Sequence, residues 1–241
     1  MGQSDKAYYL KNLDLAILLS LKGMKELYGI KMNSIQNPNR AMIYQTLFAL
    51  ERDKIICADS GSIMIQPELD SILEDIKSAG RMLLYMSVPS AYPDQCIYLG
   101  REAVLVSAYG TIGELYRIER ISLESLPEKI CKCGFCLEEL IGGTGFMEDE
   151  EAVNPVLEAH AEHLFDQECS GLKTEEWGSV SACLRMISLK DRQCIRQYLL
   201  LHDKIQDYVS VTDDYDTRLY IYTEKKVADI LTNDLLQEER L

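Results

Sequence analysis

Residues Leu47–Gly80 read LFALERDKIICADSGSIMIQPELDSILEDIKSAG. In this stretch the end of a helix is followed by two short apolar runs, Ile55–Ala58 and Ile63–Ile65, around an Asp-Ser-Gly-Ser turn. Pro67 then opens a second helix, because a helix tolerates proline in its first turn. The order of helix, tight hairpin and helix predicts a winged-helix-like region within residues 1–80.

The helices around this hairpin have apolar residues at helical spacing. Pro38 and Asn39 open the upstream helix, which runs through Arg52. The downstream helix has one apolar face, which the spacing predicts to be its core face. The residues of that face are Leu69, Ile72, Leu73 and Ile76.

A further helix is expected near the N-terminus. Asn12 is a suitable N-cap for a helix over Leu13–Lys22, and Gly23 is a suitable end. A short second element is expected over Met24–Lys31. Both belong to the same predicted N-terminal region.

After Gly80 the pattern changes to strands separated by Pro and Gly turns. Four strands are expected over Met82–Val88, Gln95–Leu99, Ala103–Tyr109 and Glu114–Ile121. The pattern becomes helical after Ser122 and again over Glu150–Gln167. Strands return, most clearly at Tyr208–Val211 and Arg218–Tyr222, before a closing helix over Lys225–Glu239.

The series predicts an α+β fold, with antiparallel sheets and flanking helices. Residues 82–140 and 180–237 both contain several strands followed by one helix, which indicates a quasi-two-fold repeat. We divide the chain into residues 1–80, the winged-helix-like region, residues 81–141, the first sheet plus a helix, and residues 142–241, a helix, the second sheet and the C-terminal helix. The three parts are expected to form one compact unit.

The charges of Asn37–Lys54, where a winged helix would have its recognition helix, do not fit duplex DNA. Arg40, Arg52 and Lys54 are nearly balanced by Glu51 and Asp53, whereas DNA binding draws most of its affinity from phosphate neutralisation by Lys and Arg. The whole chain carries a formal charge of −14. We therefore expect no nucleic-acid partner.

The negative charge is concentrated between Glu124 and Glu176. Fourteen acidic residues stand there against three lysines, a net charge of −11. The segment is interpreted either as a solvated helical surface or as a face that steers a basic or polar partner.

The N-terminal residues lack the pattern of a signal peptide, and no apolar run approaches the roughly 18 residues of a membrane span. We expect a cytoplasmic protein without membrane contact. The eight cysteines are expected to be reduced in that compartment.

The strongest candidate for a metal site combines cysteine and histidine pairs. Cys131, Cys133 and Cys136 precede His160 and His163, and four such side chains can bind zinc. Both groups fall on expected helices, with a long gap between them. We therefore interpret them as free thiols and ordinary histidines, and expect no metal.

No other motif predicts catalysis or a cofactor. Gly142–Gly145 lacks the Lys-Ser/Thr pair of a phosphate-binding loop. His160, His163 and His202 lack the flanking residues of a hydrolase or protease. The acids Asp213, Asp214 and Asp216 could bind a cation, but they fall in an expected hairpin turn, where aspartate is common.

Three apolar residues lie in otherwise polar loops, namely Phe146, Met147 and Trp177. They either pack back onto the core or form a protein-binding patch. We take them as candidate partner-binding residues. The adjacent glycines would let the loop Gly142–Met147 adapt to an apolar helix tip.

Three segments are similar to one family. The first is Leu50 to Leu73, with Cys57-Ala58-Asp59-Ser60-Gly61 before Pro67. The second is Leu99 to Leu105, and the third is Asp213 to Tyr220, with Asp216-Thr217-Arg218-Leu219-Tyr220. In order and pattern they resemble the type VII secretion-associated chaperones of the EspG kind.

The resemblance implies a central antiparallel sheet with a quasi-two-fold repeat and flanking helical bundles. It also implies a non-enzymatic cytosolic chaperone or adaptor that holds the tip of a helical-hairpin secretion substrate. The chain departs from the family in its cysteine content and in lacking the glycine expected before Arg218. A winged-helix transcriptional regulator and an uncharacterised enzyme are the alternatives.

Overall fold

The structure is a computed structural model with two compact units. Unit 1 comprises Met1–Leu83 and Tyr92–Ser122, and unit 2 comprises Leu84–Ala91 and Leu123–Leu241. The chain passes from one unit to the other within β4 (Arg81–Ser87). The described residues are 6–30, 38–59, 61–87, 95–109, 115–132, 180–202, 207–213 and 217–237.

Unit 1 contains antiparallel strands in the order β1-β7-β6-β5. Their bounds are Tyr8–Lys11 for β1, Gln95–Leu99 for β5, Ala103–Tyr109 for β6 and Leu115–Ile121 for β7. Four consecutive residues of β5, from Cys96 on, and four of β6, from Ala103 on, are buried. Because successive side chains of a strand point to opposite faces, both faces of these strands are covered.

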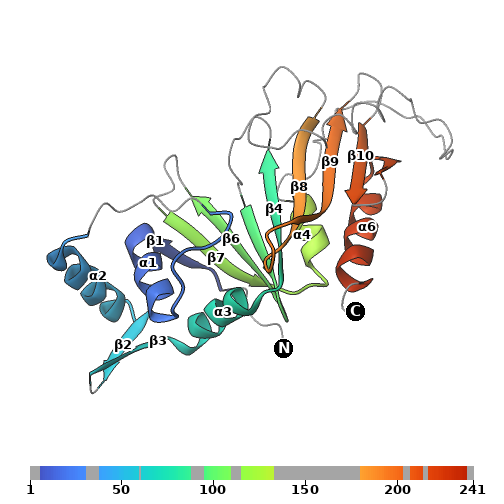
Figure 1. Cartoon of the computed structure of the whole chain (residues 1–241). Helices are drawn as coiled ribbons and strands as arrows, with labels where there is room; N and C mark the ends of the chain where they lie inside the picture. The colour runs from blue at the N-terminus through green and yellow to red at the C-terminus, as the bar shows by residue number, and fades with distance from the viewer. Residues whose placement is uncertain are drawn as a thin grey trace. The chain divides into compact units, whose positions relative to one another are not determined.

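Three helices of the chain, labelled in Figure 1, are α1 (Asn12–Leu21), α2 (Arg40–Arg52) and α3 (Pro67–Ser78). All three fall within the residues of unit 1. The expected core face of α3 is confirmed, since its apolar residues have exposed fractions between 0% and 4%. It packs on β5 and β6. Arg120 of β7 fixes the helix further through an ion pair with Asp75 and a 2.9 Å hydrogen bond to Ser71 Oγ.

The expected hairpin forms between α2 and α3. Strands β2 (Ile56–Asp59) and β3 (Ser62–Ile65) pair antiparallel. Gly61 in the turn has a φ of +87°, a left-handed conformation that glycine adopts without a Cβ clash. The expected order of elements is therefore present, while the winged-helix interpretation of it stays a prediction.

Two expectations for the N-terminal region are corrected. Asn12 lies inside α1 rather than capping it, because the carboxylate of Asp14 accepts the backbone N–H of Lys11 at 2.9 Å and moves the helix start one residue back. Residues 24–30 form neither a helix nor a strand. Gly23 and Gly29 both have positive φ angles, and such conformations end regular structure.

Unit 2 contains antiparallel strands in the order β8-β9-β10-β11. Their bounds are Val180–Ser188, Cys194–His202, Asp207–Asp213 and Thr217–Ile221. The helices are α4 (Leu126–Lys132) and α6 (Glu224–Gln237), which contact each other. Thr223 begins α6 by accepting the Lys226 N–H at 3.0 Å on its side-chain oxygen.

The α+β fold class is confirmed, with antiparallel strands and flanking helices in each unit. The quasi-two-fold repeat and the division into three parts stay predictions. Among the described helices, none has the length and apolar character needed to cross a membrane.

Candidate functional site

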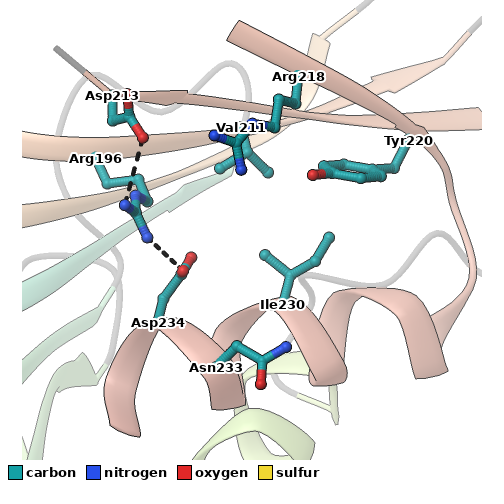
Figure 2. A pocket seen from close by; sticks show the side chains of 8 residues that line it. All are labelled: Arg196, Val211, Asp213, Arg218, Tyr220, Ile230, Asn233 and Asp234. Carbon is teal, nitrogen blue, oxygen red and sulfur yellow. Dashed lines mark hydrogen bonds and ion pairs between the residues drawn. The ribbon is translucent and has the colours of Figure 1, made fainter. Parts of the chain in front are cut away.

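Unit 2 has a hollow between its sheet and α6. Arg196 of β9 and Val211 and Asp213 of β10 line it together with residues of β11 and α6. Figure 2 shows the strand side and the helix side facing each other across it. The other lining residues are Arg218 and Tyr220 from β11, and Ile230, Asn233 and Asp234 from α6.

Strand register explains why these residues meet. Asp213 pairs with Arg196, and Val211 pairs with Tyr198 on one side and Arg218 on the other. Residues directly opposite each other point to the same face of a sheet. Alternation then places Tyr220, two residues after Arg218, on that face as well.

Arg196 holds the hollow together electrostatically. Its Nη2 lies 3.4 Å from Oδ2 of Asp213, and its Nη1 pairs with Asp234 on α6 (Figure 2). The Tyr198 hydroxyl donates to Oδ2 of Asp234 at 2.7 Å. These contacts join two strands to the helix, and charge-assisted bonds of this kind are stronger than neutral ones.

The environment shifts the pKa of two of these groups upward. Burial, and then the neighbouring Asp234, raise the pKa of Tyr198 well above its usual range. Burial by itself would lower the pKa of Arg196, but Asp234 and Asp213 outweigh it and the pKa is raised. At neutral pH Tyr198 is therefore a neutral donor and Arg196 a fixed cation.

The rest of the lining is partly apolar. Val211 is 9% exposed, and the partly exposed Tyr220 and Ile230 lie on the strand side and the helix side of the hollow. The Nζ of Lys226 lies 4.6 Å from the centre of the Tyr220 ring, within the range of a cation–π contact. The formal charges of the lining balance, because two arginines stand against two aspartates.

The volume limits what the hollow can bind. It measures about 180 Å³, whereas small-molecule sites usually occupy roughly 300–1,000 Å³. A partly apolar and electrically balanced hollow of this size has room for one or two side chains but not for a typical small-molecule ligand.

Only part of the predicted site set lies within the described residues. Asp213 does, and it ends β10 and forms an ion pair with Arg196. Phe146, Met147, Trp177, the loop Gly142–Met147, Asp214 and Asp216 lie outside the described residues, as do Cys133, Cys136, His160 and His163. The partner-binding and zinc hypotheses therefore stay untested.

Four of the described cysteines are free thiols. Cys57 and Cys194 are exposed, and Cys96 and Cys183 are buried. Cys131 lies in α4, and His202 ends β9. Within the described ranges, no group of three or more His, Cys, Asp and Glu side chains could hold a metal ion.

Sequence reasoning missed Arg196, Ile230, Asn233 and Asp234. Arg218 and Tyr220 did stand in the segment quoted for the family resemblance, and their alternate spacing on a strand indicates a shared face. The missed residues come from β9 and α6, and no short motif connects these positions.

Comparison with known proteins finds a likeness in structure alone. No protein-family model matches the chain, and no curated protein matches it in sequence. Among solved structures, it is similar to the type VII secretion system chaperone EspG5 of Mycobacterium tuberculosis, solved in complex with a PE25-PPE41 dimer. The TM-score is 0.55 at 7% sequence identity, and the likeness covers 96% of each chain. The two chains share a fold.

The likeness agrees with the expected family resemblance at the level of architecture. At 7% identity, it carries no residue of the chaperone over to this chain, and function has to be argued from the site.

Proposed function

We propose that this chain is a non-enzymatic, cytoplasmic binding protein. It acts as a secretion-associated chaperone or adaptor for a helical protein substrate. The supporting observation is that the fold matches a secretion chaperone over 96% of both chains. That chaperone was solved with a protein dimer bound. By analogy, the partner of this chain is a protein, and the tip of a helical hairpin is the shape we propose for it.

The hollow in unit 2 supplies a contact point for such a partner. Tyr220 and Ile230 offer apolar surface, and the exposed Arg218 offers hydrogen bonds at the edge. An aromatic or arginine side chain surrounded by apolar surface is typical of residues that dominate protein interfaces. The ion pairs of Arg196 keep the hollow preformed, which reduces the ordering cost of binding.

The acidic segment 124–176 is proposed as a second contact. Phe146 and Met147 within the segment, and Trp177 directly after it, would supply apolar anchors. The surrounding acids would raise the association rate and selectivity more than the affinity. These residues lie outside the described part of the chain, so this contact rests on their chemistry alone.

The experiment is affinity capture with the full chain followed by reconstitution. The tagged chain is expressed in its source cells, the captured proteins are identified, and each candidate is co-expressed with the chain and analysed by size-exclusion chromatography with light scattering. We expect one predominantly helical protein to form a complex of fixed stoichiometry. Capture of nucleic acid, or of no protein that reconstitutes a complex, would overturn the proposal.

A pair of variants locates the contact. Arg218→Glu combined with Tyr220→Ser should abolish the reconstituted complex while the circular dichroism spectrum stays unchanged. Met64→Ser is the matched control, because Met64 is 52% exposed and belongs to unit 1, whereas the residues that line the hollow all belong to unit 2. A complex that survives the double variant would place the contact elsewhere.

A further inference from the structure

Helix α2 presents aromatic side chains to solvent. Tyr44 is 61% and Phe48 is 70% exposed, while Leu50 on the opposite side is 4% exposed. The two aromatic residues are four positions apart and therefore lie next to each other on one face. Large exposed aromatic residues are typical of protein interfaces.

Two opposite charges extend this aromatic face along the helix. Arg40 and Glu51 are both exposed. They are eleven positions apart, which at about 3.6 residues per turn brings them to nearly the same angle around the axis. The face thus reads Arg40, Tyr44, Phe48, Glu51 from the N-terminal to the C-terminal end, and we call these four residues the α2 stripe.

The α2 stripe is complementary to the same stripe of a second copy when the two helices run antiparallel. A two-fold axis midway between Tyr44 and Phe48 places Tyr44 of each copy against Phe48 of the other. The same axis brings Arg40 of each copy to within one residue of Glu51 of the other, an offset of about 1.5 Å along the helix that the long arginine side chain can span. Symmetric dimers use self-complementary patches of this kind, in which residue i meets j and j meets i.

The charge of the rest of the chain favours this surface for self-association. Two copies, each with a formal charge of −14, repel one another in most orientations. The stripe itself has one basic and one acidic residue, so its net charge is zero. Two copies that meet through it gain attraction between opposite charges and have little repulsion at the contact. Among the described residues, neither Arg40 nor Glu51 is engaged in an ion pair that would compete.

We propose that α2 mediates a symmetric homodimer in which the helices of two copies pack antiparallel through the α2 stripe. This proposal does not depend on the proposed chaperone function, because the hollow lies in unit 2 and α2 lies in unit 1.

Charge exchange tests the pairing directly. The full chain is examined by sedimentation equilibrium at concentrations from about 1 to 100 μM, where micromolar affinity is measurable. Arg40→Glu alone creates two Glu–Glu contacts in the dimer, and Glu51→Arg alone creates two Arg–Arg contacts. Each single variant should weaken dimerisation by at least about tenfold.

The mixture of the two single variants distinguishes this geometry from any other. One copy with Arg40→Glu and one with Glu51→Arg restore both opposite-charge pairs, so the mixture should form a heterodimer of near wild-type affinity. The double variant carrying both substitutions should regain homodimerisation for the same reason.

Apolar substitutions provide the second test. Tyr44→Ser with Phe48→Ser should yield a monomer with an unchanged circular dichroism spectrum. Met42→Ser is the matched control, because Met42 is 42% exposed but lies on the other side of the helix. A wild-type chain that is monomeric throughout the range would overturn the proposal. So would single variants that dimerise normally, or a mixture that stays monomeric.

Discussion

At the residue scale, Lys54 adopts a conformation that lysine disfavours. Its φ is +58°. The N–H groups of Lys54 and Ile55 donate to the carbonyls of Glu51 at 3.0 Å and Leu50 at 2.8 Å. This is the Schellman arrangement at the end of α2, in which glycine normally takes the left-handed position.

Lys54→Gly should therefore stabilise the protein by about 0.5–1 kcal/mol, because the relief of the Cβ clash exceeds the extra flexibility of the unfolded chain. Urea unfolding measures the change. Asp53→Gly is the matched control, since its φ of −82° is ordinary, and it should destabilise. If Lys54→Gly destabilised the protein, the interactions of the lysine side chain would outweigh the strain of its left-handed backbone conformation.

Buried thiols give the protein a pH dependence at the same scale. Burial raises the pKa of Cys96 to about 12, and burial likewise raises those of Cys183 and Tyr198. In the folded state these groups hold their protons at pH values where the unfolded chain has lost them. The contribution of these groups to the free energy of unfolding should therefore be constant below about pH 8 and decrease as the pH rises toward 12.

The pH dependence is measured by urea unfolding at a series of pH values, with Cys96→Ala expected to show a shallower decrease. Iodoacetamide at neutral pH should modify Cys57 and Cys194 in the native state, and Cys96 and Cys183 only after unfolding. Rapid native labelling of Cys96 would contradict its burial.

At the scale of elements, α3 packs on strands β5 and β6 of unit 1. Leu73 is fully buried, and Leu73→Ala should cost roughly 2–5 kcal/mol in the free energy of unfolding. Leu21→Ala makes the same chemical change at a residue that is 40% exposed, so it should cost far less. Equal effects of the two substitutions in urea unfolding would contradict the packing of α3.

The elements that the sequence predicts well carry local signals. Pro67 and the apolar spacing of Leu69 and Leu73 specify α3, and Asn39 caps α2 by accepting the Met42 N–H at 2.8 Å. Strand β1 was not predicted, because its four residues, Tyr8–Lys11, show no distinctive pattern and pair with β7 more than a hundred positions away. Such pairing depends on the tertiary context.

The hollow in unit 2 was predictable only in part for the same reason. Arg218 and Tyr220 alternate on one short strand and can be placed on one face from the sequence. The ion pairs of Arg196 with Asp213 and Asp234 join residues 17 and 38 positions apart. No local pattern encodes those contacts, which form only when α6 packs on the sheet.

At the scale of the whole molecule, the charge argues against nucleic-acid binding. The chain has a formal charge of −14, and the exposed face of α2 holds Tyr44 and Phe48 rather than a row of basic residues. We expect no gel shift of duplex DNA at physiological salt. Sub-micromolar, salt-sensitive binding would support the winged-helix regulator instead.

The proposed role as a chaperone makes a further demand on the whole molecule. A chaperone has to keep its helical partner soluble, and we place part of that contact at the hollow, where Tyr220 and Ile230 provide the apolar surface. The most direct measurement is the soluble fraction of the captured partner when it is expressed alone, with the wild-type chain, and with the Arg218→Glu, Tyr220→Ser double variant. We predict an insoluble partner when it is alone or with the double variant, and a soluble, stoichiometric complex with the wild-type chain. A partner that is equally soluble in all three cases would contradict the chaperone role.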